Sequence, residues 1–167
     1  MSKINNLESL LIDEMRDLYN AETQLIKALP KMAEASSNDE LKEAFESHLE
    51  ETKGHAERLK SAFELLGESE KGKTCHAMKG LIEEGSEAIK IDAPPAVRDA
   101  DIIGAAQRVE HYEMAAYGCA QAFAEKLGRD DVAKLLEANL KEEGAANKKL
   151  TEIAQTVNDD AHAVATG

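Results

Sequence analysis

Cysteine, proline and aromatic residues are scarce in this sequence. Its 167 residues include two cysteines, three prolines, three phenylalanines, three tyrosines and no tryptophan. Cys75 and Cys119 are too few for a four-cysteine metal site or a disulfide framework, so we expect a reduced, cytoplasmic setting. So few prolines, together with only ten glycines, are not the composition of a disordered segment.

Positive charge and long hydrophobic runs are also in short supply. Twenty lysines and arginines stand against 33 aspartates and glutamates, which gives a formal net charge of −13. That balance argues against nucleic acid and anionic membrane surfaces as partners. No apolar run approaches the roughly 20 residues of a membrane span, and residues 1–6 lack the apolar region of a secretion signal. We therefore expect neither nucleic acid nor a membrane among the partners.

Helix-forming residues are abundant and are spaced with helical periodicity. Alanine, leucine, glutamate and lysine dominate the chain, and all four favour helices. Apolar residues that recur every three or four positions predict long helices over residues 7–35, 39–66, 95–127 and 130–157, with a shorter helix over 75–91. The tail over 158–167 is expected to fray. A chain of this length is ordinary for one domain, so we expect a single domain over residues 1–167.

The lengths of the connections predict how these helices are arranged. Short links join the first long helix to the second and the third to the fourth, so each pair is expected to form an antiparallel hairpin. About 28 residues separate the second long helix from the third, which is enough chain to return along the molecule. The predicted fold class is therefore all-α, a ferritin-like four-helix bundle with a long crossover that carries a short extra helix.

Acidic residues interrupt the apolar stripes of three of the long helices. Glu22 stands in the middle of the stripe of the first helix, and Glu143 lies seven residues from Leu136 and seven from Leu150 in the fourth. In the third helix Glu110 and Glu113 are spaced i, i+3 and flank the stripe. An ionised carboxylate in an apolar seam is costly unless it is paired or binds a metal.

The second long helix adds histidines to this pattern. His48, Glu51 and His55 are spaced i, i+3 and i+7, so they share one face. Each residue alone has a plainer interpretation: a glutamate can reach solvent from the edge of a seam, and a histidine can be hydrogen-bonded in the core. Their coincidence in four helices favours a site of two metal ions, because five glutamates with one or two histidines match dinuclear carboxylate centres. Oxygen ligands with some imidazole suit iron, which we favour, or manganese.

The same residues carry a resemblance to a known family. The sequence resembles the YciF-like bacterial stress proteins, a branch of the ferritin-like superfamily related to rubrerythrins, over about residues 5–155. The matching stretches are DLYNAE at 17–22, HLEET at 48–52, CHAMKGL at 75–81, AAQRVEHYE at 105–113 and LKEE at 140–143.

This resemblance implies a ferritin-like bundle, a homodimer, a role in the stress response and a dinuclear metal centre. The ligands that it implies are Glu22, Glu51, Glu110, Glu113 and Glu143. The usual Glu-x-x-His motif of the superfamily would place a histidine at position 54, where Gly54 stands. The site is therefore expected to be rich in carboxylates, with either His48 or His55 as a ligand.

Three functions are compatible with these features. The first is a di-iron or di-manganese oxidoreductase that acts on peroxide or O₂, in the manner of a peroxidase, a catalase or a ferroxidase. The second is a non-catalytic iron-binding or protective protein, and the third is a helical interaction module whose acids are solvated. The expected partners are a second copy of the chain and small oxidants or metal ions. Tyr19, one turn before Glu22, is expected either to hydrogen-bond the site or to pack beside it.

Overall fold

The structure, a computed structural model, describes residues 4–164 and is all-helical over that range. No strand occurs among these residues. The helices in chain order are α1 (Leu7–Ala35), α2 (Asp39–Leu66), α3 (His76–Lys90), α4 (Pro95–Lys126) and α5 (Asp130–Val164). No helix in the described part of the chain is both long enough and apolar enough to cross a membrane.

The helices begin and end within one residue of the predicted positions, except at the end of α5. This helix continues to Val164, seven residues beyond the predicted end at residue 157. The prediction of a frayed tail is therefore wrong for residues 158–164. The reason is that this segment contains neither glycine nor proline and includes alanines, which favour helix. Residues 165–167 lie outside the described part of the chain.

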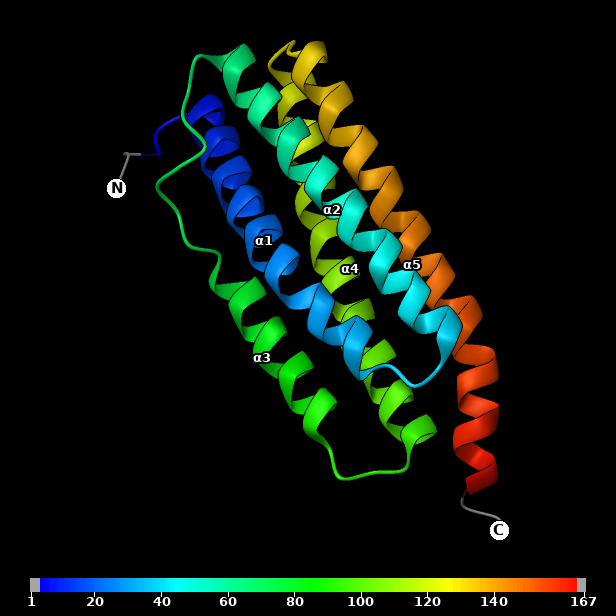
Figure 1. Cartoon of the computed structure of the whole chain (residues 1–167). Coiled ribbons are helices and arrows are strands. Elements are labelled where there is room, and N and C mark those ends of the chain that lie inside the picture. The colour runs from blue at the N-terminus through cyan, green and yellow to red at the C-terminus, as the bar shows by residue number, and fades with distance from the viewer. Residues whose placement is uncertain (1–3, 165–167) are drawn as a thin grey trace.

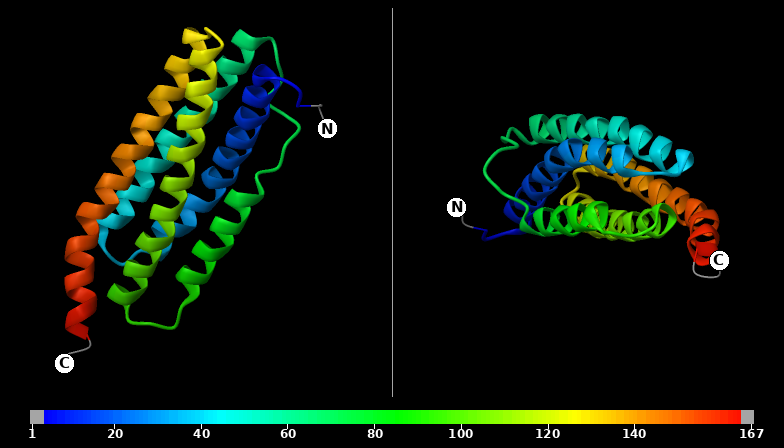
Figure 2. Two further views of the ribbon diagram at one scale, coloured as in Figure 1. Left: turned by 180° about the vertical axis from the view of Figure 1, so that it is seen from behind. Right: turned by 60° about the horizontal axis from the view of Figure 1, so that its bottom comes forward.

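Four long helices lie side by side, and α3 lies outside them (Figures 1 and 2). Helix α1 runs antiparallel to α2, and α4 runs antiparallel to α5. Further contacts join α2 to α5 and α1 to α4, while α3 packs on α1 and α4. Because the connection through α3 returns along the molecule, α2 and α4 run in the same direction, as the sequence predicts (Figure 1).

The buried residues form two apolar clusters with a polar layer between them. One cluster, which includes Leu11, Leu18 and Phe63, is built from the first half of α1, the second halves of α2 and α4, and the first turns of α5. The other includes Leu29 and Phe45 from the opposite halves of the same helices. The buried polar residues other than Asp99 all belong to the layer between the clusters: Glu22, His48, Thr52, His55, Glu110, Glu113, Asn139 and Glu143.

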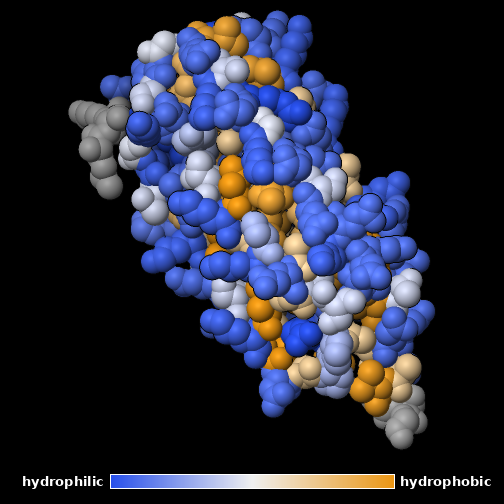
Figure 3. Space-filling model, in the orientation of Figure 1, coloured by the Kyte–Doolittle hydropathy of each residue, from blue (hydrophilic) through white to orange (hydrophobic). Residues whose placement is uncertain are grey.

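The outer surface, unlike the two apolar clusters, is largely polar (Figure 3). Figure 3 shows that one face of the molecule is mostly hydrophilic, with hydrophobic side chains in a broken band along its middle and in smaller groups near both ends. Much of the exposed charge is arranged in pairs within a helix, such as Glu50 with Lys53 and Glu137 with Lys141. Such exposed pairs contribute little to stability, so the apolar clusters dominate the folding energy.

Asp99 is the buried acid that lies outside the polar layer. It is 2% exposed and accepts hydrogen bonds from the backbone N–H of Ser37 (3.0 and 3.1 Å) and Asn38 (2.8 Å). These two amides lie in the turn between α1 and α2, where a helix start leaves backbone donors without partners. Asp99 therefore anchors this turn to α4.

We expect the substitution Asp99→Ala to lower the free energy of unfolding by about 1–3 kcal/mol, because it leaves two backbone N–H groups without their acceptor. Urea denaturation measures the change. Asp101→Ala is the matched control, since Asp101 is an exposed acid two residues along the same helix. Equal stability of the two variants would show that Asp99 does not anchor the turn.

Candidate metal centre

All four long helices contribute side chains to the polar layer. Glu22 comes from α1, and His48 and His55 come from α2. Glu110 and Glu113 come from α4, and Glu143 from α5. Each of these six residues is at most 6% exposed. The interrupted stripes of the sequence therefore meet at one level of the fold.

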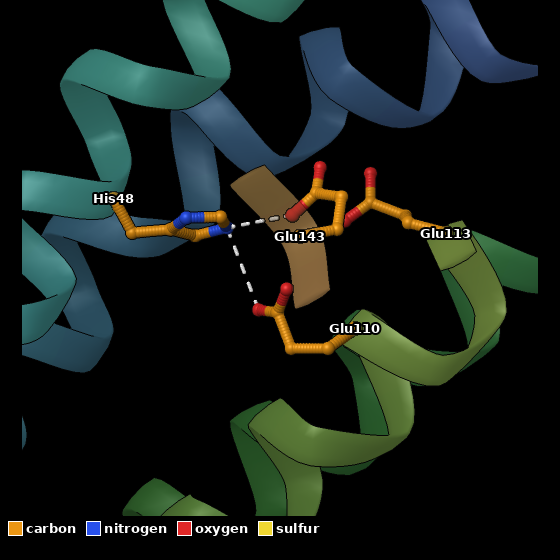
Figure 4. A group of neighbouring side chains, drawn as sticks. All are labelled: His48, Glu110, Glu113 and Glu143. Carbon is orange, nitrogen blue, oxygen red and sulfur yellow. Dashed lines mark ion pairs between the residues drawn. The ribbon is translucent and has the colours of Figure 1, made fainter. Parts of the chain in front are cut away.

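Four of these residues form one compact group, which we call the His48 group: His48, Glu110, Glu113 and Glu143. Figure 4 shows the three carboxylates converging, with the His48 ring opposite them. The Nε2 atom of His48 lies 3.4 Å from Oε1 of Glu110 and 3.5 Å from Oε2 of Glu143. One ligand atom from each of the four residues lies within 4.8 Å of all the others.

A second group, the His55 group, consists of Glu22, His55 and Glu143. The Nδ1 atom of His55 lies 3.4 Å from Oε1 of Glu22 and 2.9 Å from Oε1 of Glu143. Glu143 thus belongs to both groups, with Oε1 directed to His55 and Oε2 directed to His48. A carboxylate in this position can bridge two ions.

Many polar atoms in this layer lack a partner. Among the described residues, nine buried side-chain atoms have no hydrogen bond, and all except Arg98 Nε belong to the two groups. They are Glu22 Oε2, His48 Nε2, His55 Nδ1, Glu110 Oε2, both carboxylate oxygens of Glu113 and both of Glu143. Oxygen and nitrogen ligands lie about 2.0–2.2 Å from Zn²⁺ or Mg²⁺, so ligands on opposite sides of such an ion are about 4.4 Å apart. The spacing of both groups therefore fits metal ions.

The electrostatics of the layer also favour a cation. Burial and the nearby charge of Glu143 raise the pKa of both Glu110 and Glu113 well above the usual range of a glutamate. Burial likewise raises the pKa of Glu22, although His55 opposes the shift. Of these carboxylates, only Glu143 has a lowered pKa: burial acts to raise it, but the close contact with His55 at 2.9 Å and the charge of His48 lower it.

The pKa of His55 reflects the same excess of negative charge. Burial acts to lower its pKa, yet the close contacts with the carboxylates of Glu143 and Glu22 raise it to about 10. The carboxylates therefore attract any available positive charge, and in the metal-free protein the proton on His55 supplies part of it. Divalent cations would supply more, because each brings two charges among ligands that repel one another.

A carboxylate outside the two groups orients each histidine. Glu142 accepts from Nε2 of His55 at 2.9 Å, which leaves Nδ1 directed to the His55 group. Glu51 lies 3.2 Å from Nδ1 of His48, which leaves Nε2 directed to the His48 group. Arg58 holds Glu142 through two hydrogen bonds of 2.7 Å. Carboxylates in this position fix the tautomer of metal-binding histidines.

The structure brings together six of the seven predicted site residues and places Glu51 apart. The side chain of Glu51 is 43% exposed and belongs to neither group. Both His48 and His55 join a group, whereas the sequence left the choice between them open. Tyr19 packs against an apolar cluster, which was one of its two predicted roles.

Sequence analysis missed two buried residues that support the site. Tyr117 donates a hydrogen bond to Oε1 of Glu22, and Asn139 donates to the hydroxyl of Tyr117 at 3.0 Å. A signal for both was present in the sequence. Tyr117 follows Glu113 by four residues and Asn139 precedes Glu143 by four, so each shares a helix face with a candidate ligand.

Comparison with known proteins gives consistent matches over nearly the whole chain. Residues 6–162 match the family model described as domain of unknown function DUF892. Protein YciF of Escherichia coli strain K12 is 46% identical over 152 residues, which cover 90% of this chain and 92% of that protein. The crystal structure of the E. coli stress protein YciF matches with a TM-score of 0.91 and 44% identity, covering 93% of this chain and 99% of that one. The structure of YcfI from Rhodopseudomonas palustris has a TM-score of 0.86 at 48% identity, covering 90% and 96%.

We expect Glu113→Gln to stabilise the metal-free protein at pH 8. Both oxygens of Glu113 are buried without a partner, and the pKa is raised in the folded state. A raised folded pKa makes folding most favourable below the unfolded pKa of about 4.3, and this stability is lost as the pH rises. Glutamine carries no charge, so the advantage of the variant should grow with pH and reach about 1–3 kcal/mol.

Urea denaturation in the presence of a chelator at pH 5 and pH 8 measures this difference. Glu125→Gln, at an exposed position of the same helix, controls for the change in net charge. A Glu113→Gln variant that is less stable than wild type at pH 8, or a difference that does not change with pH, would contradict the electrostatic account.

Proposed function

Since this chain belongs to the DUF892 family and to the YciF-like stress proteins, we propose that it is a dinuclear metal protein of the bacterial stress response. Two ions, iron in preference to manganese, occupy the polar layer. The observation that carries this proposal is the position of Glu143, whose two oxygens are directed to different histidines. A shared carboxylate between two groups of ligands is the arrangement of a bridged metal pair.

The fold supports the same proposal. Two antiparallel hairpins, α1 with α2 and α4 with α5, are joined by the long connection that contains α3. One long crossover between two helical hairpins is the topology of ferritin-like four-helix bundles, which hold metal pairs between facing helices. We therefore assign this chain the ferritin-like arrangement in a single domain. The homodimer that the family resemblance implies and the cytoplasmic setting that the scarcity of cysteine suggests remain parts of this proposal.

The donor set favours iron or manganese over other metals. Four glutamates and two histidines supply the ligand atoms, and neither cysteine belongs to a group. Hard oxygen donors with imidazole suit Fe and Mn, whereas thiolate donors would indicate zinc or copper(I). In our assignment His48, Glu110 and Glu113 would hold one ion and Glu22 and His55 the other, with Glu143 shared between the two groups.

A pair of ions bound in this way supplies the chemistry for binding and reducing peroxide or O₂. The side chains of this chain prepare the site for it. Glu142 and Glu51 orient the two histidines, and Tyr117 positions Glu22 through its hydroxyl. The apolar clusters above and below the layer surround the ligands with hydrocarbon, which strengthens their attraction for a cation.

We expect the protein to bind two Fe²⁺ or Mn²⁺ ions per chain. The bridge makes a specific prediction for single substitutions: Glu22→Ala removes one ion, Glu110→Ala removes the other, and Glu143→Ala weakens both. Elemental analysis after dialysis measures the stoichiometry. Glu152→Ala, which replaces an exposed glutamate of α5, should bind like wild type. Fewer than one ion per wild-type chain, or normal binding by Glu143→Ala, would refute the proposal.

The metal-loaded protein is further expected to consume hydrogen peroxide, and the Glu143→Ala variant should lose this activity. Peroxide concentration followed over time, with free metal at the same concentration as the control, measures it. Two bound ions per chain without turnover would instead favour the second function considered above, a protective protein that binds iron without catalysis.

A further inference from the structure

Two hollows reach the His48 group from different sides, and their linings differ in character. One lies between α1, α3 and α4, has a volume of about 60 Å³, and is lined mainly by apolar residues such as Leu25, Leu81 and Ile82. The other lies between α2 and α5 and is larger, about 450 Å³. Both end on His48 and Glu110.

The larger hollow, which we call the acidic vestibule, is rich in carboxylates. Its charged lining consists of four glutamates and one lysine: Glu40, Glu43, Glu51, Glu110 and Lys149. Glu40, Glu43 and Glu51 follow one another at intervals of three and eight residues along α2, so they lie on one side of that helix. Eleven residues of helix span about 16 Å. The three glutamates are therefore spread along α2 from its start to the level of the His48 group.

The acids at the mouth of the acidic vestibule are not neutralised. Within residues 4–164, Glu40 and Glu43 make no ion pair, in contrast to Glu50 and Glu57 on the same helix, which pair with Lys53 and Lys60. Four carboxylates against one lysine, Lys149, leave the hollow with a negative potential that concentrates cations and raises their association rate.

The inner end of the acidic vestibule also favours a cation. Nε2 of His48 and Oε2 of Glu110 are buried there without a hydrogen-bond partner, and these residues are 6% and 3% exposed. Glu51 lies between the mouth and this end, since its side chain is 43% exposed and contacts Nδ1 of His48 at 3.2 Å. Carboxylates therefore accompany the whole path from solvent to the His48 group.

The apolar hollow cannot serve the same purpose. A divalent cation that enters it loses its water and meets hydrocarbon side chains, and an uncompensated charge in such surroundings is very costly.

We propose that the acidic vestibule is an entry site for divalent cations, in which Glu40 and Glu43 capture the hydrated ion and Glu51 passes it to His48 and Glu110. This inference rests on the proposed metal centre. It assigns to Glu51 a role in delivery, in place of the ligand role that the sequence suggests.

Stopped-flow uptake of Co²⁺, followed with a fluorescent indicator of the free ion, tests this proposal. The double variant Glu40→Gln/Glu43→Gln should bind Co²⁺ at least about tenfold more slowly at low ionic strength, within the range of electrostatic steering, and its rate should depend less on salt. Lys149→Glu should act in the opposite direction and accelerate uptake. The number of ions bound at equilibrium should stay that of wild type in both.

Glu46→Gln is the matched control, because Glu46 is an exposed glutamate on α2 that lines a different hollow. Uptake by the double variant at the rate of this control overturns the entry site while leaving the metal centre intact. A reduced number of bound ions in the double variant also overturns it, since the residues would then be equilibrium ligands. Absence of Co²⁺ binding by the wild type, in contrast, overturns the metal centre itself.

Discussion

The burial of four carboxylates at one level of the fold is the constraint on which the rest of this structure depends. Acidic groups taken out of water are costly unless positive charge compensates them. Two histidines supply part of the compensation, and Glu113 receives none from the described residues, since both its oxygens lack a partner. The apolar clusters on either side of the layer stabilise the helices strongly enough to hold these groups together. The buried carboxylates thus lower the stability of the metal-free fold, and a bound cation would restore it.

Much of the architecture was predictable from the sequence because helices of this length carry a strong periodic signal. Glu22 and Glu143 were found as interruptions of an apolar stripe, which is a local property. The end of α5 was missed because a polar, alanine-containing tail shows no apolar stripe, although nothing in it stops a helix. The periodicity of apolar residues indicates which residues face a core. It cannot indicate a helix whose residues extend beyond the core.

The division of roles within α2 shows where finer use of helix geometry would have helped. At about 100° per residue, His55 lies roughly 20° around the helix from His48, whereas Glu51 lies roughly 60° away. The two histidines therefore point to the same side, and Glu51 is displaced toward the flank, as the structure shows. The pairing of His55 with Glu142 could not be predicted in this way, because it depends on the register between α2 and α5.

The positions of the acids, more than the net charge of −13, determine where this protein attracts a cation. Several exposed glutamates, such as Glu50 and Glu57, have a lysine one turn away that cancels their field. Among the described residues, some other acids without an ion pair belong to the polar layer or line the hollow between α2 and α5. Since a field falls off within about 10 Å at 0.1 M salt, Glu40 and Glu43 act on an ion near the mouth of this hollow, whereas Glu51 and the buried carboxylates act on it further in. The arrangement of charge, rather than its amount, therefore connects the surface of this protein to its centre.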